Sequence, residues 1–131
     1  MHVTRVAVGH SRLVYVIVAD KRFQYGKARS KVAYIGTTQN GVSRVAQSAA
    51  CWTDYVLGHR GVKAFEVRIV FCERRQNVKT WLKLEHALLI MFREVYGQVP
   101  TCNTQGKRMR ETDEFRYFAR TRIRRILEDL A

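Results

Sequence analysis

Three side chains in this chain have the types and the surroundings that phosphodiester hydrolysis needs. Tyr34 lies in a strand-like run that ends in Tyr-Ile-Gly at Gly36, and Arg44 follows eight residues after that glycine. Glu85 is the lone acid within an apolar helical stretch. A phenol can exchange a proton, a guanidinium can hold a phosphate through paired hydrogen bonds, and a carboxylate can ligate a divalent cation. Tyr34, Arg44 and Glu85 are therefore candidate catalytic residues.

The surroundings of Glu85 carry the argument for this acid. On a helical projection its neighbours are apolar: Leu82, Leu88, Leu89 and Phe92. Burying a lone carboxylate is costly unless the group is paired or binds a cation. We therefore expect Glu85 to face apolar packing or the edge of a cleft and to ligate a metal ion. A salt bridge to one of the many arginines is the alternative.

The other candidates each have a functional and a structural explanation. Tyr15 lies centrally in a neighbouring strand-like run and could reach the same face as Tyr34, although tyrosines are also common on sheet faces. Gly36 permits a sharp turn or the close approach of a phosphate. Arg44 falls in the first turn of an expected helix, where the dipole disfavours a cation and favours an anion. This position suggests that Arg44 is held there for a phosphate; a solvated surface arginine is the alternative.

The elements that must position these residues follow from hydrophobic periodicity. The pattern predicts strands over 12–19, 32–35 and 64–72, a polar loop or wide hairpin over 20–30, and helices over 42–57, 78–96 and 112–130. Gly36 is expected to end the second strand, and Gly97 with Pro100 to stop the second helix. The order β-β-α-β-α-loop-α predicts an α+β fold in which helices pack on a small sheet.

Composition points to a polyanionic partner. The 131 residues include 24 Lys and Arg against 11 Asp and Glu, which gives a net charge of +13 and a pI near 10.3. A domain this basic attracts nucleic acid and gains affinity by releasing counterions, whereas a membrane surface is disfavoured because the cations form no polybasic tail. Three cysteines without a CxxC pair, and no signal peptide or apolar run of membrane-spanning length, indicate an intracellular, cytoplasmic protein.

Two groups of cations are candidate nucleic-acid contacts. The last predicted helix has an apolar stripe and, on another face, a row that recurs every four residues: Arg116, Arg120 and Arg124. Such a row can follow a phosphate backbone, although like charges at this spacing repel and a solvated basic face is the alternative. The second group comes from the first loop and the last one: Lys27, Arg29, Lys31 and Lys107.

The order of these residues resembles the GIY-YIG nuclease family over roughly residues 12–107. The matching positions are Tyr15, Tyr34 with Gly36, Arg44, Glu85 and Asn103. The resemblance implies one domain over 1–131, with a small, mainly antiparallel three-stranded sheet flanked by helices. The basic amphipathic helix at 112–130 would be an addition to that fold.

The resemblance also implies an activity, namely metal-dependent hydrolysis of double-stranded or branched DNA with one Mg²⁺ or Mn²⁺ and no small-molecule cofactor. Glu85 would ligate the cation, and Arg44 would clamp the scissile phosphate. Tyr34 would take a proton from the attacking water, directly or through a relay, which demands nearby cations because a free phenol has a pKa of about 10. Tyr15 would position water or phosphate, and Asn103 would brace the site.

Two other functions stay open. A catalytically inactive nucleic-acid-binding module on the same fold is suggested by Leu13, Thr37 and Ser48, which stand where many relatives carry other residues. A basic protein-interaction domain, such as one bound to a ribosome, is the third possibility. It predicts no preference for DNA over other polyanions.

Overall fold

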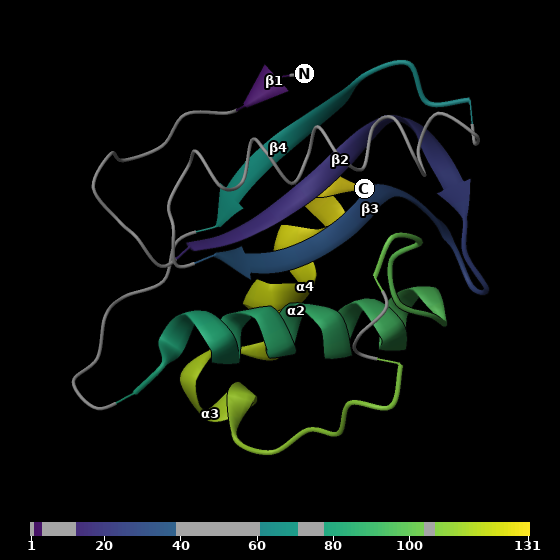
Figure 1. Cartoon of the computed structure of the whole chain (residues 1–131). Coiled ribbons are helices and arrows are strands. Elements are labelled where there is room, and N and C mark those ends of the chain that lie inside the picture. Colours follow the sequence, from purple (N-terminus) through teal and green to yellow (C-terminus); the bar gives the residue numbers. More distant parts are fainter. Residues whose placement is uncertain (1, 4–12, 39–60, 71–77, 104–106) are drawn as a thin grey trace.

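The computed structural model describes residues 2–3, 13–38, 61–70, 78–103 and 107–131 (Figure 1). The helix predicted over 42–57 therefore lies outside the described residues. Within the described parts the chain folds as α+β, with helices against one mostly antiparallel sheet (Figure 1). This coarse architecture was predicted from the sequence.

The sheet contains four strands in the order β1-β4-β2-β3: β1 (His2–Val3), β2 (Leu13–Gln24), β3 (Arg29–Thr38) and β4 (Phe65–Val70). The central strand β2 is antiparallel to both β3 and β4, and β1 is parallel to β4. The prediction of three strands missed β1, since two residues are too few to leave a periodic signal.

The β2–β3 hairpin is longer than predicted. The residues expected to form a loop over 20–30 mostly continue the two strands, and Tyr25 donates its backbone N–H to the carbonyl of Ala28 where the chain turns. An irregularity in the pairing lies between Val18 and Phe23, so several polar residues of β2 bulge outward while Phe23 and Tyr25 are buried. The bulge breaks the alternation of polar and apolar residues that would have revealed a strand.

Helix α2 (Thr80–Tyr96) matches the predicted helix over 78–96 and packs on β2 and β3. Leu84, Leu88 and Phe92 are fully buried on it. Gly97 ends the helix, as expected: its φ of 88° places it in the left-handed region, and its N–H donates to the carbonyl of Arg93. This packing fixes Glu85, which lies between Leu84 and Leu88, against the sheet.

The helix predicted over 112–130 is two helices, α3 (Glu114–Tyr117) and α4 (Arg120–Leu130). Phe118 and Ala119 between them are extended. In one continuous helix Phe118 and Ile123 would point about 140° apart, because each residue turns about 100°. The break lets Phe118, Ile123 and Leu127 all enter the core. Helix α4 packs on α2 and β3.

Within the described parts of the chain, none of the helices has the length and apolar character needed to cross a bilayer.

Candidate functional site

The hairpin brings the two candidate tyrosines together. Tyr15 on β2 pairs with Gly36 on β3, and Ile17 pairs with Tyr34, so Tyr15 and Tyr34 are diagonal neighbours on one face. Their ring centroids lie 5.8 Å apart with the planes inclined at 35°. Tyr15 is buried and Tyr34 is half-buried. The sequence-based expectation that both could reach the same face agrees with this geometry.

Gly36 serves this cluster differently from what was predicted. The strand does not end there but continues to Thr38, and φ at Gly36 is not positive. A Cβ at position 36 would instead lie 2.5 Å from Cε1 of Tyr34, well inside van der Waals contact. The glycine is therefore required by space, because the Tyr34 ring lies directly over it.

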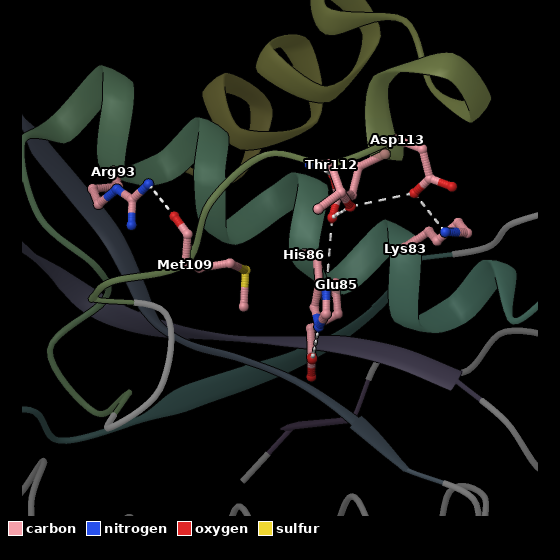
Figure 2. Close-up of polar contacts among 8 residues, drawn as sticks. Lys83, Glu85, His86, Arg93, Met109, Thr112 and Asp113 are labelled. Atoms are coloured by element: carbon pink, nitrogen blue, oxygen red, sulfur yellow. Dashed lines mark hydrogen bonds and ion pairs between the residues drawn. The ribbon is translucent and has the colours of Figure 1, made fainter.

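Glu85 approaches the same cluster from α2. Its side chain is 7% exposed, and Figure 2 shows it directed from the helix toward the strands. The carboxylate is close enough to Tyr34 for its charge to act on the phenol. The structure therefore gathers Tyr15, Tyr34 and Glu85, which are distant in sequence, and Glu85 is buried as the apolar pattern around it predicted.

The surroundings of Tyr34 strongly favour the protonated phenol. Burial raises its pKa above the ordinary value of 10.0, and the charge of Tyr15, a hydrogen bond with Tyr15 and the charge of Glu85 raise it further. Cys102, which is buried nearby, adds to the same direction. A base would need the opposite shift, so these neighbours do not by themselves prepare Tyr34 to accept a proton.

Asn103 is bound to the strand that carries Tyr34. Its Oδ1 accepts the backbone N–H of Ile35 at 3.0 Å, and its Nδ2 donates to the carbonyl of Ile35 at 2.9 Å. Next to it, the Cys102 N–H donates to the carbonyl of Ala33. These bonds cover the outer edge of β3, and the amide of Asn103 holds the backbone beside Tyr34 rather than pointing into open space.

His86 lies between two acids, Glu85 and Glu114, and sequence reasoning missed both His86 and Glu114. His86 Nε2 lies 3.9 Å from Glu85 Oε1, and His86 Nδ1 lies 3.6 Å from Glu114 Oε1. Figure 2 shows His86 beside Glu85 on α2, with a dashed contact toward the segment that carries Thr112. His86 follows Glu85 directly in the sequence, which was a usable signal. Glu114 gave none, because only the fold returns it to α2.

Glu114 is buried and ionised. Burial alone would raise its pKa, but hydrogen bonds from the Thr112 N–H, at 2.8 Å, and from the Thr112 hydroxyl, at 3.0 Å, outweigh that effect and hold the pKa below the ordinary value. Lys83 and Asp113, 2.6 Å apart, join the same segment to α2 (Figure 2). The ion pair lowers the pKa of Asp113 and raises that of Lys83.

The C-terminal arginines do not form the continuous row that was predicted. Arg116 is exposed on α3, whereas Arg120 and Arg124 belong to α4 beyond the break. Arg120 pairs with Glu94 and Glu111, and its guanidinium lies 4.2 Å from the centroid of the Phe115 ring. Arg124 donates to Glu128 at 3.0 Å. Two of the three arginines are thus engaged with acids of the same chain.

The remaining candidate contacts lie near the turn of the β2–β3 hairpin and on the loop at residue 107. Lys27 and Arg29 are exposed near the hairpin turn, where Lys27 Nζ donates to the carbonyl of Glu94 and Arg29 Nε donates to Gln24. Lys31 lies farther along β3 and is partly buried. Lys107 is exposed, and its carbonyl accepts a hydrogen bond from Arg93.

Arg44 lies outside the described residues, so its distance from Tyr34 and Glu85 is not part of this geometry. Among the residues that are described, no three His, Cys, Asp or Glu side chains gather in a way that could hold a metal ion. The described site is therefore a cluster of two phenols and one buried carboxylate, with Asn103 bound to the adjoining strand.

Comparisons with known proteins add no relatives. No protein-family model matches the chain, and neither the curated proteins nor the solved structures contain a match. The resemblance to GIY-YIG nucleases is therefore a prediction based on the residues themselves.

Proposed function

We propose that this protein is a metal-dependent DNA endonuclease that hydrolyses phosphodiester bonds with one divalent cation. The observation that carries the proposal is the convergence of Tyr15, Tyr34 and Glu85 from β2, β3 and α2. A purely structural cluster of tyrosines does not need a buried carboxylate beside it, whereas here a phenol, a carboxylate and the imidazole of His86 lie next to one another. The net charge of +13 supports a nucleic-acid substrate.

Each residue of the site has a role that fits its surroundings. Tyr34, held protonated by its neighbours, donates a hydrogen bond to the phosphate or to the attacking water. It would accept a proton from that water only after losing its own, as a phenolate that a nearby cation stabilises against the shift in its pKa. Tyr15 orients Tyr34, and Asn103 holds β3 in place. Arg44 is proposed to clamp the scissile phosphate through its planar guanidinium.

A hard divalent cation is compatible with the donor set of the site. Glu85 offers carboxylate oxygens, which suit Mg²⁺ or Mn²⁺, and Mg²⁺ commonly binds through one or two carboxylates, waters and substrate phosphates rather than a full protein cage. Glu85 would hold the cation together with the substrate. When bound, such a cation stabilises the charge that develops on the phosphate oxygens.

Plasmid cleavage with Mg²⁺ or Mn²⁺ tests the proposal. We expect Glu85→Gln and Arg44→Ala to lower the cleavage rate by at least about a hundredfold, the size of effect seen when one stabilising group is removed from a catalytic site. Glu66→Gln is the matched control, because Glu66 is an acid paired with Arg68 on β4. Cleavage at an unchanged rate in the Glu85 and Arg44 variants would show that these residues are not catalytic.

A nucleic-acid-binding module without turnover is the second candidate, and the raised pKa of Tyr34 favours it. It predicts salt-sensitive DNA binding and no nicking with any divalent cation. Metal-dependent nicking that is lost in Glu85→Gln excludes it.

A further inference from the structure

A cavity of about 370 Å³ lies at the C-terminal end of α2, beside the candidate site. Its lining includes Arg93, Gln98, Pro100, Thr101, Asn103 and Lys107. Asn103 joins it to the site, since the same residue that lines the cavity is hydrogen-bonded to Ile35, the neighbour of Tyr34. A volume of this size lies within the range of small-ligand pockets.

The charge of this cavity distinguishes it from a second one. Arg93 and Lys107 are its charged lining residues, and none of the described residues around it is acidic. The other cavity, of about 440 Å³ between the strands and the end of α4, is lined by three acids against two cations: Asp20, Glu66, Asp129, Lys31 and Arg68. An anionic ligand is therefore favoured in the first cavity and not in the second.

The helix end does not cancel this preference. The carbonyls at the C-terminus of a helix carry partial negative charge and repel anions. Here Gly97 donates to the carbonyl of Arg93, the Lys27 N–H donates to that of Tyr96, and Lys27 Nζ donates to that of Glu94. With these carbonyls already bonded, the positive charges of Arg93 and Lys107 determine the sign of the cavity.

The wall of the cavity is fixed, and donors remain on it. Arg93 donates hydrogen bonds to the carbonyl of Lys107 and to that of Met109, the second of which is drawn in Figure 2, so its position does not depend on a ligand. The Lys107 ammonium is exposed, and Pro100, although mostly buried, contributes an apolar edge to the lining. An apolar surface beside cationic and amide groups suits a molecule with one flat apolar part and one phosphate.

We propose that this cavity binds one nucleotide unit of the substrate strand next to the scissile phosphate. The proposal rests on the proposed nuclease function and adds a substrate subsite to it. Lys107 contacts the phosphate, Gln98 and Thr101 supply hydrogen bonds, and Pro100 packs against the base or the sugar. A bound nucleotide here is positioned relative to Tyr34 through Asn103 and β3.

The test measures binding of deoxyadenosine 5′-monophosphate to the full chain by ¹H–¹⁵N NMR titration, with Lys107→Glu as the variant. We expect shifts centred on the cavity residues and an affinity about tenfold lower in Lys107→Glu, because one exposed attraction is lost and one repulsion is added. Lys63→Glu is the control, since it makes the same change of net charge at an exposed position outside both cavities.

Three outcomes overturn the inference: no shifts at the cavity, equal weakening in Lys107→Glu and Lys63→Glu, or equal affinity for inorganic phosphate and the nucleotide. The last result would show a simple anion site. If the protein binds the nucleotide but does not cleave plasmid, the subsite is supported and the nuclease function is contradicted. If it cleaves plasmid but does not bind the nucleotide, the nuclease function is supported and the subsite is contradicted.

Discussion

The cluster around Tyr34 and the C-terminal segment over 107–131 differ in where their ionisable groups lie and how they are paired. Around Tyr34, burial and a neighbouring carboxylate keep the phenol protonated, and the acid is withdrawn from solvent. In the C-terminal segment most charged side chains are exposed, and some of them form ion pairs at the surface, as Arg120 does with Glu94 and Glu111. The perturbed phenol lies in the packed interior, whereas the paired charges of Arg120 lie in solvent.

The contrast between these two regions shows which charged groups of a basic protein are the better candidates for a functional site. A run rich in arginine looks like a phosphate-binding surface in sequence, yet Arg124 is bound to Glu128 in the fold. Groups that favour a particular protonation state inside a packed cluster are better candidates, since perturbed ionisation gathers at functional sites. Variants that disturb one region and leave the other intact test this contrast.

The largest effect is expected for Asn103→Ala, which breaks the interior region. The variant leaves the buried N–H and carbonyl of Ile35 without the amide that bonds to both, and we expect a loss of about 2–4 kcal/mol in the free energy of unfolding. Urea unfolding followed by circular dichroism measures it. Thr101→Ala, two residues earlier in the same loop, is the control and should lower the free energy of unfolding by less than about 1 kcal/mol. Equal losses in both variants would show that Asn103 does not hold β3.

Gly36→Ala should be next in size. The added Cβ would lie 2.5 Å from Tyr34 Cε1, so the ring must swing away, and we expect a loss of about 1–3 kcal/mol in the free energy of unfolding. Plasmid cleavage should fall with it because Tyr34 is displaced from Tyr15. In Tyr34→Leu the obstacle is gone, so the further change Gly36→Ala should cost little in that background. If Gly36→Ala destabilised the Tyr34→Leu protein as much as it destabilises wild type, the added Cβ would be in conflict with a residue other than Tyr34.

The interior arrangement was largely predictable from the sequence. Apolar periodicity placed Glu85 on a buried face, and the assignment of two neighbouring strands allowed Tyr15 to reach the same face as Tyr34, since side-chain direction follows from element type. The reason for Gly36 was not predictable. Its conflict with Tyr34 depends on the rotamer of a ring two residues earlier, and a glycine after a strand-like run indicates a turn more often than a contact.

The surface arrangement was not predictable, because the partner of a charged side chain depends on what the fold brings beside it. Glu94 lies 26 residues before Arg120 in the sequence, and neither residue indicates the other. The break at Phe118 was equally hidden, since no proline or glycine marks it. It arises because Phe118 and Ile123 must both reach the core.

Arg120 and Arg122 sharpen the comparison within one helix. Arg120→Ala should lower the free energy of unfolding by about 1 kcal/mol, because it loses two exposed ion pairs and the Phe115 contact. Arg122 is exposed and makes no ion pair with another described residue, so Arg122→Ala should leave stability unchanged.

DNA affinity should respond in the opposite order. An arginine that contacts phosphate contributes about one unit to the slope of log affinity against log salt concentration. Arg122→Ala should reduce this slope by up to about one unit, and Arg120→Ala by less, since its charge is already balanced. Fluorescence anisotropy at several salt concentrations measures both. If Arg120→Ala reduced this slope more than Arg122→Ala did, Arg120 would be the phosphate contact despite its ion pairs.

The effect expected for Glu114→Gln is about as small as that for Arg120→Ala, and its pH dependence identifies the cause. The pKa of Glu114 is lowered in the folded state, so the carboxylate stabilises the fold above its unfolded-state pKa of about 4.3. That contribution, about 1 kcal/mol, is lost as the pH falls through the still lower folded-state pKa. Wild type and Glu114→Gln should therefore differ in urea unfolding at pH 7, and the difference should shrink progressively as the pH falls below about 4.3. Exposed Asp129→Asn should match wild type over the same range. If the difference in the free energy of unfolding stayed constant with pH, the hydrogen bonds from Thr112 would not depend on the charge of Glu114. The ion pair between Lys83 and Asp113 would then be the charged contact that holds the segment to α2.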